Sequence, residues 1–206
     1  MSGALPWYIA RSAGLIAWAL LSASVIWGLT MSSRTRPFGH RPRPAWMLDL
    51  HRWLGGLASV FVAVHLAAIL ADRYVNFSVL SVLVPFQATW RTGAVAWGVV
   101  AMWFLVAVES TSLLRRHLPR QAWRMVHGAS FPLFIMATVH AFTAGTDAST
   151  LAFEAVAIPV ILAVAVLTAK RLAEVTRPGP PPRGSAPSGS ATSGSAATGP
   201  TDLVQV

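Results

Sequence analysis

The sequence has no cysteine among its 206 residues. This absence excludes disulfides, thiolate-ligated iron–sulfur clusters and covalently attached c-type haem, which needs a cysteine pair before a histidine. Any metal centre in the chain must therefore use histidine or carboxylate ligands.

Charged residues are also scarce, at 11% of the sequence, whereas 54% of the residues are hydrophobic. A soluble domain usually has about 25% charged residues, so the deficit indicates that much of the apolar surface faces lipid. The net charge of +9 is compatible with nucleic acid binding, but the basic residues lie between long apolar runs. We therefore expect membrane lipid, and no nucleic acid, as a partner.

Long apolar stretches define the fold class. An apolar helix of about 20 residues spans the roughly 30 Å hydrocarbon core of a bilayer. Five such stretches occur, at about 6–30, 47–71, 93–114, 122–144 and 150–169. The first has no basic n-region and no clear small-residue cleavage site, so we expect a helix there and not a signal peptide. The sequence thus predicts an all-α membrane protein with five transmembrane helices.

Basic residues predict the orientation of these helices, because arginine and lysine gather in cytoplasmic connections. Most of them fall near the connections 1–2 and 3–4 or after the fifth helix: Arg34, Arg36, Arg41, Arg43, Arg52, Arg115, Arg116, Arg120, Arg124, Lys170, Arg171, Arg177 and Arg183. The opposite side has Arg73 and Arg91. We expect the N-terminus outside, the C-terminus in the cytoplasm, and helices two and four running outward. The abundant alanine and arginine are typical of high-GC bacteria, so the expected location is the inner membrane of a bacterial cell.

Two segments fall outside the five spans. Residues 75–91 are apolar but too short to cross a bilayer, and Pro85 interrupts them, so we expect them along the outer surface. Residues 178–200 are rich in Pro, Gly, Ser, Ala and Thr, a composition that cannot bury a core. The expected organisation is a transmembrane domain over residues 1–172 and a disordered cytoplasmic tail over 173–206.

Four histidines lie inside the predicted helices, where ionisable residues are costly and usually functional. His51 and His65 are 14 residues apart in the second helix, and His127 and His140 are 13 apart in the fourth. Because both helices run in the same direction, His51 and His127 share one depth, and His65 and His140 share another about 20 Å away. Two imidazole pairs suit two b-type haems with six-coordinate iron in a four-helix-type bundle, whereas zinc needs three or four ligands at one point.

Helical phase tests this arrangement. Fourteen residues bring His65 to within about 40° of the His51 face. The face between them has small side chains, at Gly55, Ala58 and Val62. Thirteen residues place His140 about 140° away from the His127 face of an ideal helix. Pro132 lies between these two histidines, and a proline-induced kink there is one way to reset the phase.

The His-x13-His helix, followed two helices later by a His-x12-His helix, resembles the transmembrane domain of the ferric reductase and NADPH oxidase family. The resemblance covers about residues 7–170. It implies that His51 and His127 are the axial ligands of an inner haem iron, and that His65 and His140 are those of an outer one. In that family, electrons pass from cytoplasmic NADPH through FAD to the inner haem, then to the outer haem and an external acceptor such as ferric iron or oxygen.

The full-length enzymes of that family continue into flavin- and NADPH-binding domains, whereas roughly 35 residues follow the last helix here, without a phosphate-binding glycine motif. The chain is therefore similar to stand-alone bacterial members, which act as haem subunits of an oxidoreductase; the haem subunit of the periplasmic methionine sulfoxide reductase system belongs to the same group. We expect two haem b groups, with flavin only on a partner. Arg11 is a candidate to bind an outer haem propionate through its guanidinium, or to snorkel to the outer headgroups.

Three functions are compatible with these observations. The first is transmembrane electron transfer from a cytoplasmic flavoprotein reductase to external ferric iron or oxygen. The second is oxidation of quinol by a haem subunit that supplies a periplasmic reductase or flavoprotein. The third is a haem-free membrane scaffold, which a reduced-minus-oxidised absorption spectrum distinguishes from the other two.

Overall fold

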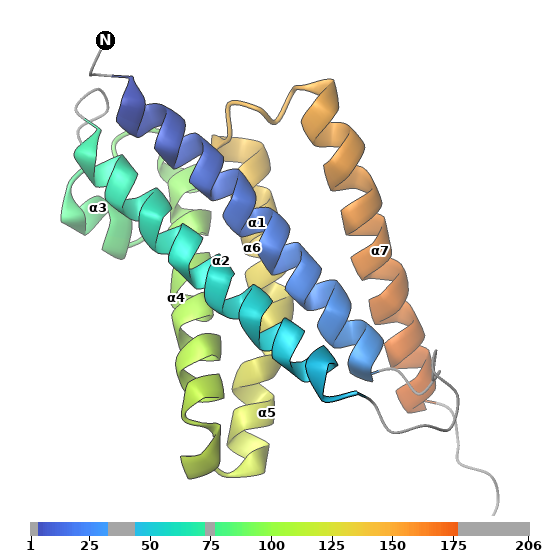
Figure 1. Ribbon diagram of the computed structural model, residues 1–206. Coiled ribbons are helices and arrows are strands. Elements are labelled where there is room, and N and C mark those ends of the chain that lie inside the picture. Colours follow the sequence, from blue (N-terminus) through green and yellow to red (C-terminus); the bar gives the residue numbers. More distant parts are fainter. Residues whose placement is uncertain (1–3, 33–43, 73–76, 177–206) are drawn as a thin grey trace, which may run out of the picture. The chain divides into compact units, whose positions relative to one another are not determined.

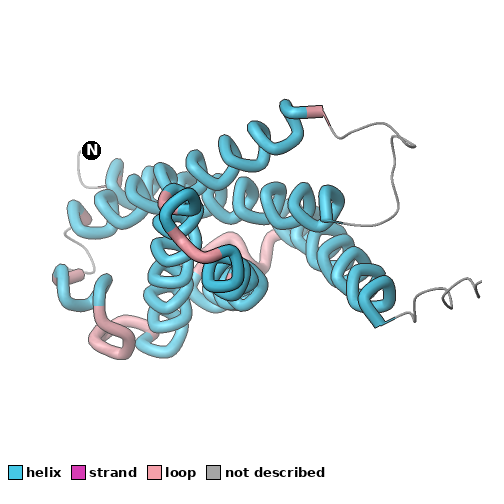
Figure 2. The backbone as a smooth tube through the Cα atoms, turned by 90° about the horizontal axis from the view of Figure 1, so that it is seen from below, coloured by secondary structure: helices cyan, strands magenta, loops and turns pink. Residues whose placement is uncertain are grey.

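The computed structural model describes residues 4–32, 44–72 and 77–176. Outside these residues lie the predicted tail after residue 176 and the arginines that predict the orientation from the connections 1–2 and 2–3: Arg34, Arg36, Arg41, Arg43 and Arg73. The chain divides into two units, Met1–Thr176 and Arg177–Val206, and the description concerns the first. Its elements are helices throughout the described residues (Figures 1 and 2): α1 (Leu5–Ser32), α2 (Ala45–Ala71), α3 (Val79–Leu83), α4 (Thr92–Leu113), the 3₁₀ turn η1 (Arg115–His117), α5 (Arg120–Gly128), α6 (Ser130–Ala144) and α7 (Leu151–Thr176).

Five helical spans are long and apolar enough to cross a membrane, and they confirm the predicted fold class: α1, α2, α4, α5 together with α6, and α7. Large apolar side chains are exposed on their outer faces, for example those of Trp53, Val60 and Leu162. This is the surface expected of helices whose surroundings are lipid.

The first four spans begin and end within about two residues of their predicted bounds, whereas the last runs to Thr176 instead of 169. Residues 173–176, assigned to the tail, are therefore helical. The segment from Lys170 to Glu174 consists of good helix formers, which continue the helix beyond its apolar part.

The helices pack in two closely paired sets, α1 along α2 and α4 along α6, and α1 also contacts α6 and α7 (Figure 1). The indole Nε1 of Trp18 on α1 donates a hydrogen bond to Thr138 Oγ1 on α6, over 3.1 Å. By contrast α2 and α6, which carry histidines, make few close backbone contacts with each other. The backbones of these two helices therefore lie apart, and side chains of both line one cavity.

The fourth span is interrupted at Ala129, between α5 and α6. Pro132 has no backbone N–H, so it cannot bond the carbonyl of Gly128, and its ring clashes with that carbonyl in a regular helix. The Ala129 N–H instead donates to the Val126 carbonyl (2.9 Å), three residues back, and α6 resumes with a bond from Leu133 N–H to the Ala129 carbonyl (3.0 Å). The helix is thus broken where the carbonyl loses its partner.

The segment between α2 and α4 contains the short helix α3 and folds back on α4. The indole Nε1 of Trp103 donates to the carbonyl of Leu83 (2.9 Å). Arg91 Nη1 donates to the carbonyl of Thr143 at the end of α6 (2.7 Å). These bonds attach the segment to the middle of α4 and to the end of α6. Its place on the outer membrane surface stays a prediction.

Candidate functional site

The four histidines form two separate pairs. The ring centroids of His51 and His127 are 6.0 Å apart with planes at 78°, and those of His65 and His140 are 6.4 Å apart with planes at 80°. This is the pairing expected from their depths. The helix is interrupted at Ala129, between His127 and His140, so the faces of these two histidines are not related by the phase of one continuous helix.

The spacing within each pair fits one metal ion between two imidazoles. A metal–nitrogen bond of about 2.0 Å on each side, together with the radii of the two rings, separates the centroids by roughly 6 Å. Both observed separations match this value. In the part of the chain that the structure describes, no three His, Asp or Glu side chains converge on one point, so the arrangement is one of pairs.

Backbone carbonyls hold His65 and His140, which we call the outer pair after their predicted depth; His51 and His127 are called the inner pair. The Nδ1 of His65 on α2 lies 2.6 Å from the carbonyl oxygen of Ala10 on α1, and the Nδ1 of His140 on α6 lies 2.8 Å from that of Ala94 on α4. Because a carbonyl only accepts, Nδ1 carries the proton in each ring. The lone pair is then on Nε2, the nitrogen that a metal ion would use, and the carbonyl bond orients the ring.

The two inner histidines are held differently from each other. His51 Nδ1 is 3.1 Å from the Ser24 carbonyl oxygen and 3.2 Å from the Ser24 hydroxyl. His127 Nδ1 is buried and has no hydrogen-bond partner among the described residues. The ring of His127 stacks instead on Trp123, one turn earlier in α5, with centroids 5.0 Å apart and planes at 21°.

Glycines on the neighbouring helices make room for the outer imidazoles. A Cβ atom on Gly14 of α1 would lie 2.9 Å from His65 Nδ1, and one on Gly98 of α4 would lie 2.7 Å from His140 Nδ1. Real Cβ atoms do not approach other atoms so closely, so only glycine fits at these two positions. Small residues at helix contacts let neighbouring backbones come this near.

Gly28 lies against the inner pair less tightly, since a Cβ there would be 3.2 Å from His51 Cε1 and the ring would have to shift slightly. These glycines were not among the predicted site residues, although the sequence contains a signal for them. Gly14 and Gly28 are separated by 14 residues, the spacing of His51 and His65 on the adjoining helix. When two antiparallel helices are in contact, equal spacings place Gly14 beside His65 and Gly28 beside His51.

A cavity of about 230 Å³ surrounds the outer pair. Its walls include both outer histidines, their two glycines, and an ion pair: His65, His140, Gly14, Gly98, Arg11 and Asp147. The remaining lining is mainly apolar, with side chains from α1, α2, α4 and α6 and from the segment after α2. A concave, largely apolar site with a few polar groups suits a cofactor.

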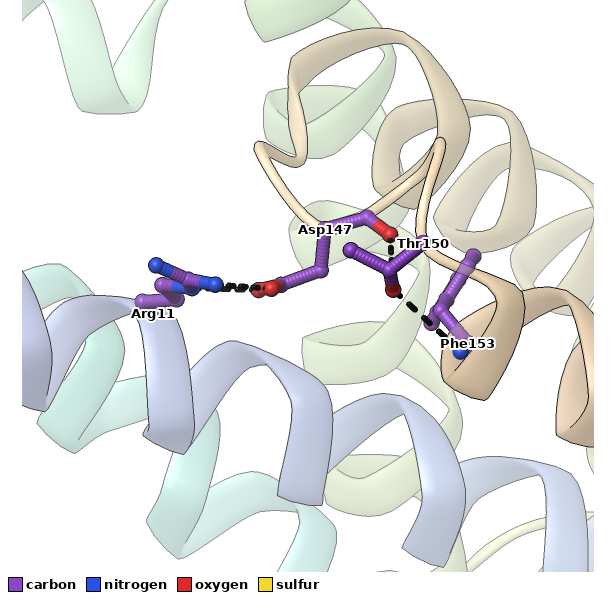
Figure 3. A network of polar contacts seen from close by, with 4 residues as sticks. All are labelled: Arg11, Asp147, Thr150 and Phe153. Atoms are coloured by element: carbon purple, nitrogen blue, oxygen red, sulfur yellow. Dashed lines mark hydrogen bonds and ion pairs between the residues drawn. The ribbon is translucent and has the colours of Figure 1, made fainter.

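Arg11 forms a bidentate ion pair with Asp147, which lies in the connection between α6 and α7 (Figure 3). The guanidinium Nε and Nη2 each donate to one carboxylate oxygen. Arg11 therefore holds the pKa of the Asp147 carboxyl below its ordinary value, chiefly through these hydrogen bonds. The same connection is ordered by Thr150, whose hydroxyl donates to the Asp147 carbonyl (2.7 Å) and accepts from the Phe153 N–H (3.3 Å). A propionate contact of Arg11 stays a prediction.

Glu109 brings a carboxyl group to the inner half of the site. Its side chain on α4 lies against Gly55 on α2, where a Cβ would be 2.4 Å from Oε1. Gly55 is one helical turn from His51. Glu109 is half-buried and takes part in neither of the two ion pairs that link described side chains, Arg11–Asp147 and Arg52–Asp49.

Comparison with known families matches residues 13–138 to the family described as "Ferric reductase like transmembrane component". The match includes His51, His65 and His127 and ends two residues before His140. No curated protein and no solved structure matches the chain. Transmembrane electron transfer is the function that such a domain suggests. Because the match covers more than half of the sequence, the chain belongs to the ferric-reductase-like transmembrane family.

Proposed function

We propose that the chain carries electrons across the membrane through two b-type haems, one between each histidine pair. The spacing of the imidazoles is the observation that supports this most, with centroids 6.0 and 6.4 Å apart. The carbonyl bonds of the outer pair add to it, since they direct Nε2 into the space between the helices. A flat macrocycle would occupy the gap between α2 and α6.

Each haem, when bound, supplies an iron that accepts and releases one electron. In this proposal His51 and His127 hold the inner haem, and His65 and His140 hold the outer one. With an imidazole on each side, the iron would have no open position for oxygen, so the histidines would hold the group and would not form a reaction site at the iron. Rings anchored through Nδ1 keep their positions when the charge at the centre changes.

Apolar side chains separate the two levels. Ala101, Leu105 and Leu133 form a buried cluster from α4 and α6, with Val62 of α2 packed against it. These residues lie between the two histidine levels in each helix. They exclude water and ions from the middle of the bundle, where an unpaired charge is costly, while an electron needs only the two haem levels to cross.

The proposed direction is outward. Electrons would enter from a cytoplasmic flavoprotein reductase and leave to an external acceptor such as ferric iron or oxygen. The cell is a bacterium, the membrane is its inner membrane, and the N-terminus is outside. This orientation rests on the basic residues of the connections, such as Arg115 and Arg116 after α4.

Quinol is a second candidate donor, and Glu109 is the observation that favours it. Oxidation of a quinol releases protons together with electrons, so it needs a proton acceptor within the membrane. A half-buried carboxyl group one helical turn from the level of His51 supplies such an acceptor. In this case the electrons would go to a periplasmic reductase or flavoprotein.

Haem analysis of the purified full chain tests the proposal. We expect two non-covalent haems per chain, released completely by acid–acetone, and a reduced-minus-oxidised spectrum of b type. Membranes supplied with NADPH and a flavoprotein reductase, or with quinol, then distinguish the two donors by the rate of haem reduction. A chain that binds no haem when haem is abundant would show that it is a scaffold.

A further inference from the structure

Three of the four histidines share one arrangement. Nδ1 bonds a backbone carbonyl on the neighbouring helix, and the residue four positions after that carbonyl is a glycine against the imidazole. The carbonyl–glycine pairs are Ser24 with Gly28, Ala10 with Gly14, and Ala94 with Gly98. His127 is the exception, because its Nδ1 is buried without a partner in the described residues.

Ser112 is at the fourth position of this pattern. It follows Gly98 by 14 residues on α4, as Gly28 follows Gly14 on α1. Fourteen residues return to within about 40° of the same helix face. Ser112 and Gly98 therefore point toward the span that carries His127 and His140, at the two depths of these histidines.

Contacts at the inner end of α4 support this register. The guanidinium carbon of Arg115 lies 4.6 Å from the centre of the Trp123 ring, and that ring stacks on His127. His127 is one turn after Trp123 in α5, and Ser112 is about one turn before Arg115. Because the two segments run in opposite directions, Ser112 lies at the level of His127.

A serine changes how the imidazole can be held. At the other three positions no Cβ is present, and the ring approaches the carbonyl directly. The equivalent carbonyl here is that of Val108. It receives only the longer of two bonds from the Thr111 hydroxyl, at 3.2 Å, whereas the bond to the Ala107 carbonyl is 2.7 Å. Ser112 Oγ, Trp123 Nε1 and His127 Nδ1 are all buried without a hydrogen-bond partner among the described residues. A hydroxyl has two acceptor lone pairs, which match these two N–H donors.

We propose that Ser112 is a positioning residue for His127 in the haem-bound protein. There its hydroxyl, which has no partner among the described residues, would accept the Nδ1–H of His127. Ser112 would thereby set the redox potential of the inner haem. The inference rests on the proposed function. An acceptor on the Nδ1–H makes a ligating imidazole more basic. A more basic ligand stabilises ferric over ferrous iron and lowers the midpoint potential. A hydroxyl is a weaker acceptor than the carbonyls that serve His65 and His140, so Ser112 distinguishes the inner site from the outer one.

The test is a redox titration of the purified full chain with haem, combined with low-temperature electron paramagnetic resonance of the ferric state. Ser112→Ala removes the acceptor, and we expect one of the two midpoints to rise while the other is unchanged. A shift of about tenfold in the ferrous-to-ferric ratio, or about 59 mV for one electron, is the expected size. Ser112→Thr retains the hydroxyl and should restore the midpoint. Ser110→Ala removes a nearby hydroxyl that bonds its own helix at Val106 and should change nothing.

Unchanged midpoints and an unchanged ferric signal in Ser112→Ala, at full haem content, would overturn the inference and leave the proposed function intact. If Ser112→Ala does not hold haem, Ser112→Gly and Ser112→Thr decide the question. Glycine opens the site to the Val108 carbonyl, a stronger acceptor, so the inner midpoint should be lower than with threonine; equal midpoints contradict the inference. If the wild-type chain binds no haem, the proposed function itself is wrong.

Discussion

The imidazole of His140 packs on Gly98 so closely that a Cβ on this glycine would lie 2.7 Å from the ring Nδ1. The same imidazole bonds the Ala94 carbonyl, four residues earlier on α4. The two contacts together determine where the ring lies and which of its nitrogens faces the space beside His65. Substitution of this glycine is therefore a test of the outer site that leaves all four histidines in place.

Gly98→Ala should weaken the outer haem. The added methyl group must displace the imidazole, which then loses its carbonyl acceptor, and loss of such a bond typically costs about 10–100-fold in affinity. Haem titration of the apoprotein, followed by absorption, measures this change. Gly93→Ala on the same helix is the matched control, since a Cβ there meets no atom within 4 Å. Equal haem affinity in the two variants would contradict the assigned contact.

His140→Ala should remove or perturb the outer haem and leave the inner haem reducible from the cytoplasmic side. The reason is that, in the proposed arrangement, each iron would depend on one imidazole from α2 and one from the fourth span. Haem content and reduction spectra measure the outcome, with the exposed His117→Ala in η1 as the control. Two haems with unchanged spectra in His140→Ala would show that another residue ligates the outer iron.

His51→Ala should interrupt electron transfer at the inner haem instead of the outer one. With the inner level lost, the outer haem remains bound but is no longer reduced from the cytoplasmic side. Stopped-flow reduction in sealed vesicles of known orientation separates the two levels. An outer haem that is still reduced at the wild-type rate from that side would contradict the proposed order of electron transfer.

Single cysteines test the orientation, because the natural chain has none. Thr146→Cys, in the connection between α6 and α7, should react with a membrane-impermeant maleimide in intact cells. Ser185→Cys, in the predicted cytoplasmic tail, should react only after the cells are lysed. Labelling of position 185 in intact cells would reverse the orientation and with it the direction of electron transfer.

Asp147→Asn should lower thermal stability at neutral pH, because it removes the bidentate ion pair with Arg11. In the folded protein Arg11 holds the pKa of Asp147 below the ordinary value of 3.8. A carboxylate with a lowered pKa stabilises the fold above its unfolded pKa, and this contribution is lost as the pH falls through the folded pKa. The difference in Tm between the wild type and Asp147→Asn should therefore persist at pH 5–7 and shrink below about pH 3.8. A Tm difference that is the same at all pH values would mean that the charge of Asp147, and so its ion pair with Arg11, does not contribute to stability.

Much of the architecture follows from short-range features of the sequence. A run of apolar residues long enough for the membrane specifies a span by itself, and the 1.5 Å rise of a helix places each histidine at a depth. The pairing of His51 with His127 and of His65 with His140 could thus be expected before any fold was known. A kink at Pro132 could likewise be considered from the sequence, because a proline removes a backbone hydrogen bond within its own helix.

Contacts between helices required the tertiary structure. The break at Ala129 sets how far α6 turns, and so which face His140 presents, and a proline alone does not specify that angle. The carbonyls of Ala10 and Ala94 bond the histidines only because the offset between neighbouring helices places them there. Every residue has the same carbonyl group, so the sequence does not single them out. Arg11 and Asp147 are 136 residues apart, and only packing of α1 near the end of α6 brings them together. Length, hydropathy and periodicity act within one helix, whereas these relationships depend on the rotation and offset of one helix against another.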